Sequence, residues 1–372
     1  MRIGIDARSL HLEGVGRYIK ELIKALSTID NTNEYIIYIS QRNYLKYFKS
    51  CINKTNFNFI YIPVNNFDLH KQPIFISRLF RDNIDLFHAT DHWFVPLKLP
   101  CPLVTTFHDL MIKTRPLSLS LQARFYSKVA SWIAIKKSSS IITVSEFNKK
   151  EIIKYYPSIQ NKITVIPLGV SNEFFLIKDK SKIKNILKKY NILKNYFLFV
   201  GSLRNYKNLS TLFKAFALLP AYIKSNYDII IAAKIDHKYK KIFSLVKKLS
   251  LDNYVHFINY VPTQDLVLLY NGATCFITLS LYESFCLPII EAMACGTPVI
   301  ASKIMAIPEV GGDAILLVNP FNISEIKEAL IKIVENRNLR NTLVQKGLQR
   351  ALNFSWIKTA QETIKVYEKA VL

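Results

Sequence analysis

Short runs of β-branched and aromatic residues alternate with longer helical patterns along the whole chain, and this alternation constrains the fold most strongly. Examples of the runs are RIGID at 2–6, LVTTFHD at 103–109, YFLFVGS at 196–202 and CFITLS at 275–280. Continuous apolar runs are typical of strands buried on both faces of a parallel sheet that helices cover. Because strands that alternate with helices indicate βαβ units, we expect an α/β protein with doubly wound parallel sheets.

The length of the chain predicts two Rossmann-like domains. Its 372 residues exceed what a single hydrophobic core usually organises. A charged segment around residues 169–182 follows the last strand of the first half, so we place the N-terminal domain at 1–175 and the C-terminal domain at 176–355. Residues 356–372 predict a helix long enough to pack back on the first domain. Ligands of such sheets bind beyond the carboxyl ends of the strands, so a cleft between two facing domains is the expected site.

Composition limits the location and the partners. The net charge of +23 is spread evenly along the chain and fits either a solvated surface or attraction to an anionic membrane. The chain carries no nucleic-acid-binding signature, and its five cysteines contain no C-x-x-C pair that would indicate a disulfide framework or a zinc site. Without a long apolar run or a signal-peptide core, we expect a cytoplasmic protein. The charge leaves open a peripheral position on the inner face of the cytoplasmic membrane.

The segment ESFCLPIIEAMACGTPVIAS, residues 283–302, predicts a short buried helix directly after a strand. Pro288 suits the first helical position, and Gly296 suits the position after the last turn. This helix is apolar on every side except for Glu291. A buried carboxylate is costly without a partner, so we expect a cation or the hydroxyls of a ligand to satisfy Glu291.

The loop before this helix predicts an anion site. Glu283 lies on the loop. The backbone amides of Phe285, Cys286 and Leu287 approach the helix N-terminus, where free N–H groups and the helix dipole favour anions. A site of this kind between two carboxylates suits a nucleotide sugar. The amides would bind the diphosphate, and the carboxylates would bind hydroxyls of the sugar and of the ribose.

This segment resembles the E-x₇-E motif of the retaining family-four glycosyltransferases, which have the GT-B fold. The resemblance continues, in the order of the family, through GIDARSLHLEGVGRYIKEL, FHDL, ITVSEFNKKEI, VIPLGV, FLFVGSLRNYKNLSTLFKAF and IPEVGGDAILL. It implies that Glu283 contacts the transferred sugar and that Glu291 holds the ribose. It also implies that the enzyme needs no metal and no cofactor besides its nucleotide-sugar co-substrate.

Two further motifs of the resemblance follow predicted strands. In GVGR, Gly14 and Gly16 allow the backbone to approach a phosphate, and the resemblance implies a loop that closes over the donor. A dinucleotide fingerprint would need a third glycine where Ile19 stands, which disfavours a nicotinamide enzyme.

In GSLRNYKN, the candidate binding residues are Ser202, Arg204 and Lys207. Cations at this position can hold a diphosphate and stabilise the leaving group. Many relatives place an arginine directly before the lysine, where this chain has Tyr206, and many have a glycine where this chain has Cys286.

Histidines of the first half give one catalytic candidate, His108, and one group for which a metal site is rejected. In FHDL, the resemblance places His108 beside the donor sugar, where a neutral imidazole can donate or accept a hydrogen bond. In HATDH, His88, Asp91 and His92 have no helical frame to align them, so no metal site is expected.

The segment SLQARFYSKVASWIAIKKSSS, residues 120–140, predicts a helix with aromatic and basic residues. We expect Phe125, Trp132 and Ile133 to face the core, as apolar residues of a surface helix usually do. Contact of this helix with a membrane surface is the alternative.

Together these features predict a retaining glycosyltransferase. GDP-mannose is the first expectation for the donor, because the opening GIDARSL…GVGRYI resembles bacterial mannosyltransferases of polysaccharide or lipopolysaccharide assembly. A UDP-sugar such as UDP-glucose is the alternative donor. The expected acceptor is a saccharide or a polyprenyl-linked saccharide. The remaining alternatives are a GT-B epimerase or phosphorylase, a nicotinamide oxidoreductase, and a non-catalytic basic protein that binds a membrane or RNA.

Overall fold

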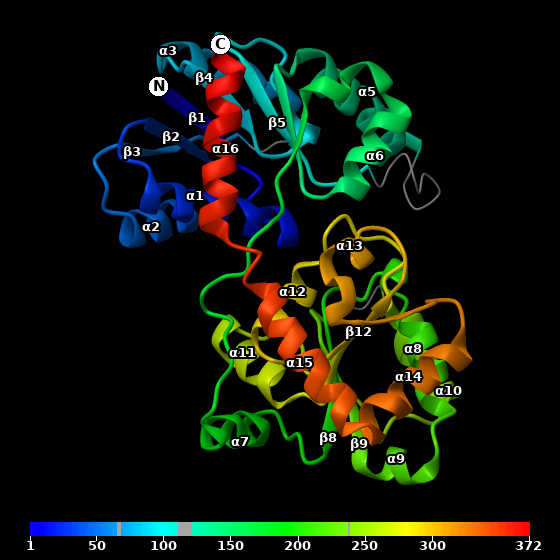
Figure 1. Ribbon diagram of the computed structural model, residues 1–372. Coiled ribbons are helices and arrows are strands. Elements are labelled where there is room, and N and C mark those ends of the chain that lie inside the picture. The colour runs from blue at the N-terminus through cyan, green and yellow to red at the C-terminus, as the bar shows by residue number, and fades with distance from the viewer. Residues whose placement is uncertain (65–67, 111–120, 237–238) are drawn as a thin grey trace. The chain divides into compact units, whose positions relative to one another are not determined.

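A computed structural model describes residues 1–64, 68–110, 121–236 and 239–372 (Figure 1). The chain divides into two compact units. Unit 1 comprises Met1–Gly169 and Ser355–Leu372, and unit 2 comprises Val170–Phe354. Each unit is an α/β structure of its own.

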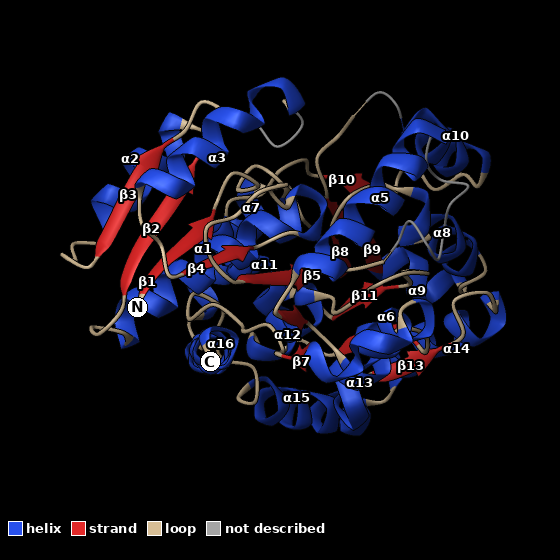
Figure 2. Cartoon of the chain, turned by 90° about the horizontal axis from the view of Figure 1, so that it is seen from above, coloured by secondary structure: helices blue, strands red, loops and turns tan. Residues whose placement is uncertain are grey.

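Unit 1 contains a parallel sheet of seven strands in the order β3-β2-β1-β4-β5-β6-β7. The strands in chain order are β1 (Arg2–Asp6), β2 (Glu34–Ile39), β3 (Phe57–Tyr61), β4 (Leu86–Ala89), β5 (Leu103–Phe107), β6 (Ser140–Thr143) and β7 (Ile163–Val165). Its α-helices, seen beside the strands in Figure 2, are α1 (Glu13–Ile29), α2 (Arg42–Cys51), α3 (Gln72–Arg81), α5 (Leu121–Lys137), α6 (Glu146–Tyr155) and α16 (Trp356–Val371). All five residues of β5 are buried, including two threonines, as expected of a strand that helices cover on both faces.

Helix α16 returns from the end of the chain to pack on unit 1, where it contacts α1 and the strands β4, β5 and β6. The Thr359 hydroxyl donates to the carbonyl of Pro167, 2.7 Å away, at the base of this helix. Gly169 lies against the first turn, and a Cβ there would stand 2.2 Å from the backbone nitrogen of Trp356. Only glycine therefore fits where the chain leaves unit 1 beside the start of α16.

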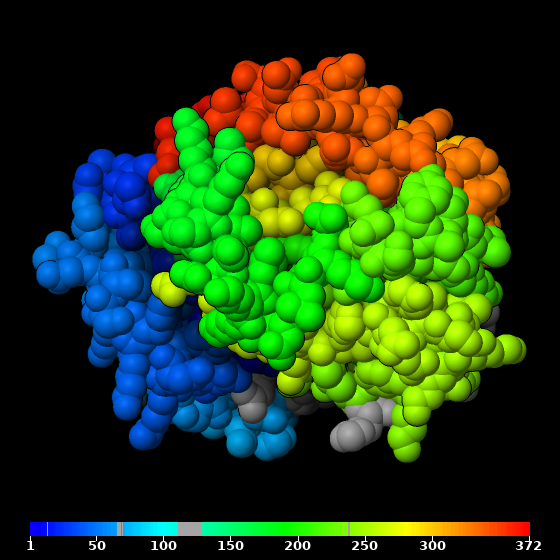
Figure 3. All heavy atoms as spheres, turned by 90° about the horizontal axis from the view of Figure 1, so that it is seen from below, coloured from blue at the N-terminus to red at the C-terminus, as the bar shows by residue number. Residues whose placement is uncertain are grey.

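Unit 2 contains a parallel sheet of six strands in the order β10-β9-β8-β11-β12-β13. The strands in chain order are β8 (Asn195–Val200), β9 (Tyr227–Ala232), β10 (Val255–Phe257), β11 (Cys275–Thr278), β12 (Val299–Ser302) and β13 (Leu316–Val318). Its α-helices are α7 (Lys180–Lys189), α8 (Leu209–Ala217), α9 (Ala221–Asn226), α10 (Lys240–Lys248), α11 (Thr263–Gly272), α12 (Leu287–Ala294), α13 (Ile307–Gly311), α14 (Ile323–Glu335) and α15 (Arg337–Ala351). Seen from below, α14 and α15 form the orange edge of this unit (Figure 3).

The predicted strands and their parallel arrangement are confirmed in both units. Every apolar run named as a strand from the sequence contains a strand of the structure, and every pairing in both sheets is parallel. Helix α12 begins at Leu287, one residue before Pro288, and Gly296 after it has a φ of 69°. The two punctuating residues thus occupy the helix ends that their backbone preferences predict.

The prediction that Trp132 faces the core is wrong, because its exposed fraction is 55%. The buried face of α5 is formed by Ser131, Ala134 and Ile135 instead, which leaves Trp132 on the solvent side. Ile133 is half-buried, and the side chain of Phe125 lies outside the part of the chain that the structure describes. The error arose because an aromatic residue was assigned to the core without a clear helical period to support it.

None of the helices within the described ranges has both the length and the apolar character that a membrane crossing requires.

Candidate functional site

The loop after β8 carries the predicted cations of unit 2. Gly201 follows the strand with a φ of 147°, and the Lys207 side chain passes close by, its Cε 3.8 Å from where a Cβ of Gly201 would stand. Ser202 on the same loop is half-buried. Lys207 closes the 3₁₀ turn η5 (Asn205–Lys207), directly before α8. The loop therefore brings the lysine side chain back over the end of its own strand.

Lys207 forms an ion pair with Glu283, the first glutamate of the motif. Its Nζ lies 2.5 Å from Glu283 Oε1, and both side chains are only 14% exposed. The Leu281 amide donates to the Tyr206 carbonyl at 2.7 Å, which joins the loop after β11 to the loop after β8. Burial alone would lower the pKa of Lys207, but the Glu283 carboxylate outweighs it and raises that pKa above its usual value. Lys207 is therefore positively charged beside the carboxylate at neutral pH.

Arg204 has a different environment from Lys207. It is exposed, and its guanidinium interacts with the hydroxyls of Tyr206 and Tyr239. The structure thus brings Lys207 to Glu283 and brings Arg204 to two tyrosines. Among the two predicted cations, Lys207 is the one that lies beside the start of the glutamate segment.

Cys286 caps the N-terminus of α12 in the left-handed backbone conformation, with φ 76° and ψ 70°. This conformation costs a non-glycine residue roughly 1–2 kcal/mol, so a glycine would adopt it with less strain. The buried thiol lies close enough to Glu283 and Lys207 to feel both charges, and burial first and Glu283 second raise its pKa. Phe285 packs edge-on against Phe354, with 5.6 Å between ring centroids. The amides predicted to bind an anion thus precede a helix whose start is fixed by packing.

Glu291 is buried on α12, as the sequence predicted, with an exposed fraction of 2%. The Tyr270 hydroxyl donates to its Oε2 at 3.3 Å. Sequence reasoning expected a cation or a ligand hydroxyl and missed this tyrosine, which lies on α11 with no local signal that marks it as a partner. The hydrogen bond from Tyr270 partly offsets the cost of burying this carboxylate in an apolar helix.

His108 follows β5 at the carboxyl edge of the sheet of unit 1. Its Nε2 donates to the Thr90 carbonyl at 2.9 Å, which places the proton on Nε2 and leaves Nδ1 as an acceptor. Burial lowers the pKa of His108 to about 4, against the Thr90 contact that favours the charged form. Tyr18 packs edge-on against the imidazole at 4.7 Å. His108 is therefore a neutral group of fixed tautomer.

Gly14 and Gly16 lie in the first turn of α1 and have different surroundings. A Cβ at Gly16 would stand 2.2 Å from the carbonyl oxygen of Leu10, whereas a Cβ at Gly14 would meet nothing within 4 Å. The absence of a side chain at Gly16 is thus required by the packing of the preceding turn. At Gly14 the open space is compatible with the approach of a ligand.

Other polar residues at this edge form hydrogen bonds or ion pairs within unit 1. His88 contacts the Tyr367 hydroxyl through Nδ1 at 2.7 Å and the Thr106 hydroxyl through Nε2 at 2.8 Å. Asp6 and Arg8, which sequence reasoning missed, form a buried bidentate pair at the end of β1. Within the described ranges, no three histidine, cysteine, aspartate or glutamate side chains are grouped closely enough to hold a metal ion.

Asp91 shares this edge and has an unusual pKa. Burial raises it to about 7 against the opposing Trp93 amide, and the carboxylates of Asp109 and Asp6 add to the rise. The buried His92 lies beside it, with Nδ1 3.4 Å from Asp91 Oδ1, and burial lowers the pKa of His92 to about 3. His92 is therefore uncharged at neutral pH, whereas the Asp91 carboxyl takes up its proton near pH 7.

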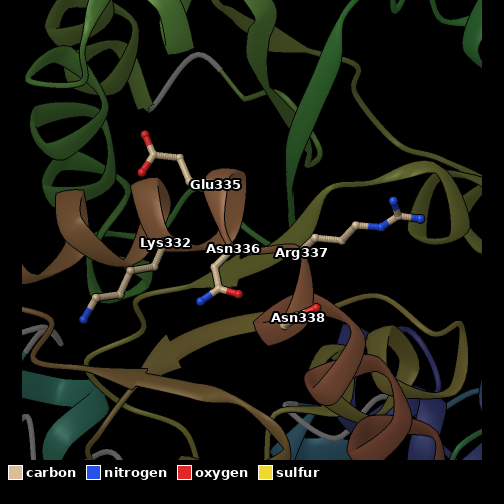
Figure 4. A pocket seen from close by; sticks show the side chains of 5 residues that line it. All are labelled: Lys332, Glu335, Asn336, Arg337 and Asn338. Atoms are coloured by element: carbon tan, nitrogen blue, oxygen red, sulfur yellow. The ribbon is translucent and has the colours of Figure 1, made fainter.

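A surface hollow of about 480 Å³ lies at the α14–α15 junction of unit 2, and none of the candidate site residues lines it. It is lined by Lys332, Glu335, Asn336, Arg337 and Asn338. Figure 4 shows the long side chains of this hollow pointing away from one another. Such a hollow has no converging polar groups of the kind that orient a ligand. The hollow therefore includes neither the Lys207–Glu283 pair nor Glu291.

Two sequence families divide the chain almost as the structure does. The family described as Glycosyltransferase Family 4 matches residues 12–174, and the family described as Glycosyl transferases group 1 matches residues 179–350. His108 and both glycines fall in the first match, and the ion pair and Glu291 fall in the second.

Individual relatives agree with these matches. The chain is 28% identical over 374 residues to the O-antigen chain mannosyltransferase B of Escherichia coli, covering 96% of each protein. It is 27% identical over 289 residues to the MMP alpha-(1->4)-mannosyltransferase of Mycolicibacterium hassiacum, covering 74% of this chain and 67% of that protein. The solved structure of Alr3699/HepE of Anabaena in complex with UDP-glucose superposes with a TM-score of 0.81 at 18% identity, covering 99% of each chain.

Proposed function

Because the chain belongs to the group 1 and family 4 glycosyltransferases, we propose that it transfers mannose from GDP-mannose to a hydroxyl of a saccharide or polyprenyl-linked saccharide. The fold is GT-B, with a Rossmann-like sheet in each unit. The similarity to an O-antigen mannosyltransferase over nearly the whole of both chains supports mannose as the sugar. The observation that carries the assignment of the site is the Lys207–Glu283 pair, followed by the buried Glu291 on α12.

In the proposed reaction, the bond between the anomeric carbon and the β-phosphate oxygen breaks. A bond from that carbon to the acceptor oxygen forms on the same face, so that the anomeric configuration is retained. The acceptor proton passes to the leaving phosphate, and the products are a nucleoside diphosphate and the glycosylated acceptor. This balance requires no metal ion and no other co-reactant.

Each site residue has one role in this proposal. Lys207 offsets the negative charge that develops on the leaving β-phosphate, and the amides of 285–287 add hydrogen bonds to the diphosphate. Glu283 binds hydroxyls of the transferred sugar, and Glu291 binds the ribose. His108 accepts a hydrogen bond from the sugar through Nδ1, because Nε2 is already used by Thr90. Arg204 serves as a second cation only after it leaves its two tyrosines.

The experiment that tests this function measures the release of nucleoside diphosphate and the transfer of labelled sugar. The purified protein is incubated with GDP-mannose, UDP-glucose, ADP-glucose or NAD, together with a set of mannosylated acceptors. Transfer from GDP-mannose with retained configuration supports the proposal. Transfer from a UDP-sugar would replace the donor while keeping the reaction class. Turnover of none of the sugars, or binding of NAD alone, would refute it.

We further propose that unit 1 docks on an anionic membrane surface through an exposed stripe of α5. The stripe is formed by Lys128, Val129, Trp132 and Lys136, all of them exposed, with Trp132 and Val129 at 55% and 39%. Residues three and four apart are neighbours on a helix surface, so a lysine lies one turn on either side of the tryptophan. Leu97, 64% exposed, adjoins the end of α5, where the Lys137 ammonium donates to its carbonyl.

This combination favours a lipid partner over a second protein. An aromatic ring flanked by lysines matches the boundary between acyl chains and anionic head groups. The net charge of +23 adds long-range attraction to such a surface. A lipid-linked acceptor would be presented at the cytoplasmic face of a membrane, which is where this stripe would hold the enzyme.

Vesicle sedimentation tests the docking surface. Binding to vesicles that contain phosphatidylglycerol is compared with binding to pure phosphatidylcholine, for the wild type, Trp132→Ala and Lys128→Glu/Lys136→Glu. Leu193→Ala is the matched control, because Leu193 is 91% exposed on unit 2. We expect anionic vesicles alone to bind and both α5 variants to lose most of that binding. If Trp132→Ala binds as well as Leu193→Ala, the surface is assigned wrongly.

A further inference from the structure

The two groups that the proposed function assigns to different parts of the donor contact each other in the structure. Lys207 is assigned to the diphosphate and Glu283 to the sugar, yet Lys207 Nζ lies 2.5 Å from Glu283 Oε1. With 14% of each side chain exposed, little water screens this pair. Lys207 therefore cannot give its full charge to a phosphate while Glu283 remains in this position.

The Glu283 carboxylate also lies where the surroundings favour an anion. It contacts the lysine, and it precedes the N-terminus of α12, which begins at Leu287 and carries positive dipole charge. The proposed function places the donor diphosphate at these same two features. One carboxylate and one phosphate would thus compete for the same favourable position.

Hydrogen bonds anchor the backbone on both sides of the pair, whereas no backbone contact within the described residues fixes the rotamers of the two long side chains. The Glu283 carbonyl accepts from the Ala306 amide at 3.3 Å, and the Leu281–Tyr206 hydrogen bond joins the two loops. Both Lys207 and Glu283 have several rotatable bonds beyond these anchors. A change of rotamer is therefore enough to separate the ammonium from the carboxylate without a change in the fold.

We propose that Glu283 is an internal competitor of the donor diphosphate for Lys207, and that donor binding exchanges the two anions. Lys207 then binds phosphate, and Glu283 is released toward the sugar. This inference rests on the proposed function and deepens it. The pair is a resting arrangement in which neither group is available until a ligand with a phosphate at the lysine opens it.

Competition of this kind has two consequences. Only molecules in which Lys207 and Glu283 are separated can bind the diphosphate, so the apparent affinity for nucleotide scales with the fraction of such molecules. By the same coupling, re-formation of the pair after transfer favours release of the nucleoside diphosphate product. Removal of the carboxylate should therefore tighten nucleotide binding, even though it abolishes a group needed for transfer.

The test measures the Kd of GDP, or of UDP if that is the base the wild type binds, by titration calorimetry. Glu283→Gln keeps the size of the side chain and removes its charge. We expect its Kd for the diphosphate to fall roughly three- to ten-fold below that of the wild type. The corresponding monophosphate, which lacks the β-phosphate, should bind both proteins equally.

A control is needed because Glu283→Gln also adds one unit of positive charge. Asp313→Asn makes the same charge change in an exposed ion pair of unit 2, where Lys346 Nζ lies 2.7 Å from Asp313 Oδ2. We expect this variant to bind like the wild type. In the background of Lys207→Gln, the gain from Glu283→Gln should disappear, because the carboxylate then has no lysine to occupy.

The outcomes separate this inference from the function on which it rests. If the wild type binds no nucleoside diphosphate, the proposed function fails. If the wild type binds but folded Glu283→Gln binds equally or more weakly, the competition is refuted and the function stands. A gain equal to that of Asp313→Asn, or one that persists without Lys207, also refutes the competition. Unfolding temperatures of all variants establish that they are folded.

Discussion

The candidate site residues at the carboxyl edges of the two sheets differ in charge. Unit 2 places a charged pair, Lys207 and Glu283, between two loops. In unit 1, His88 and His92 are buried and His108 is half-buried, and loss of solvent contact lowers their pKa values to about 3, 3 and 4. Unit 2 therefore holds a charged pair between two loops, whereas these three histidines of unit 1 are neutral. The charged groups beside them, Asp6 and Arg8, form a buried ion pair at the end of β1.

This difference matches what a transfer reaction would need from each side. Charge develops on the leaving diphosphate, so mobile cations and helix amides belong where the donor binds. Orientation of a sugar hydroxyl needs a donor or an acceptor of known tautomer rather than a charge. The His108–Thr90 contact supplies such an acceptor without a titration near neutral pH.

The largest effect is expected for Lys207→Gln. Loss of the cation that stabilises the leaving group should reduce kcat/KM for transfer by about 10²–10³. Lys346→Gln removes a lysine from an exposed ion pair of the same unit and serves as the matched control. Initial rates with saturating acceptor measure the effect. A loss of less than about three-fold in kcat/KM would show that Lys207 is a structural cation only.

The second effect concerns the neutral groups of unit 1 and appears as acid sensitivity. Below pH 6.5, the unfolded chain binds protons that His88, His92 and His108 do not bind in the native state, so the free energy of unfolding falls as pH falls. Between pH 7 and 5.5, each of these histidines should lower the free energy of unfolding by about 1.2 kcal/mol. Asp91, whose native pKa is about 7, acts in the opposite direction. It takes up a proton in the native state but not in the unfolded chain, which raises the free energy of unfolding by about 1.6 kcal/mol over the same range.

A net loss of about 2 kcal/mol between pH 7 and 5.5 follows. Urea unfolding at the two pH values measures it. In His92→Asn, the fall in the free energy of unfolding between the two pH values should be about 1.2 kcal/mol smaller. Replacement of the exposed His70 should leave this fall unchanged. A stability that rises toward pH 5.5 would contradict the neutral state of these histidines.

A smaller effect is expected for Glu291→Gln in unit 2. The variant keeps a hydrogen-bonding group but loses the charge that would bind the ribose, so the Kd for nucleotide should rise about ten-fold. The turnover number should change less than the affinity. Tyr270→Phe, which removes the hydroxyl partner of Glu291, separates positioning from direct contact. An unchanged Kd in Glu291→Gln would remove Glu291 from the binding site.

The smallest effect concerns the backbone at the start of α12. Because Cys286 has a φ of 76°, Cys286→Gly should be more stable than Cys286→Ala by about 1 kcal/mol. Both variants lose the thiol, so the comparison isolates the left-handed conformation. Chemical unfolding measures the difference. Equal stability of the two variants would mean that the backbone relaxes at this position.

Much of the fold and part of the site could be predicted from local sequence patterns. The strands followed from buried apolar runs, and the ends of α12 followed from Pro288 and Gly296. The burial of Glu291 followed from an otherwise apolar helix. Each of these inferences needs only neighbouring residues, because backbone preference and periodicity are local properties.

The remainder depends on residues that are distant in the sequence. Lys207 and Glu283 were both named as candidates, but their pairing requires the neighbouring strands β8 and β11 to bring two loops together. Tyr270 lies 21 positions before Glu291 on another helix and carries no pattern of its own. Trp132 was misplaced because aromatic character was read as core, although the buried face of α5 is formed by smaller residues.

Thermal unfolding with GDP, UDP, ADP, dTDP and NAD shows whether unit 2 binds a nucleoside diphosphate through Lys207. A ligand at 100 times its Kd adds about 2.7 kcal/mol of stability. We expect a selective rise in the unfolding temperature of the wild type with GDP, or with UDP, and a much smaller rise in Lys207→Gln. An equal rise in both proteins, or a rise with NAD alone, would contradict it.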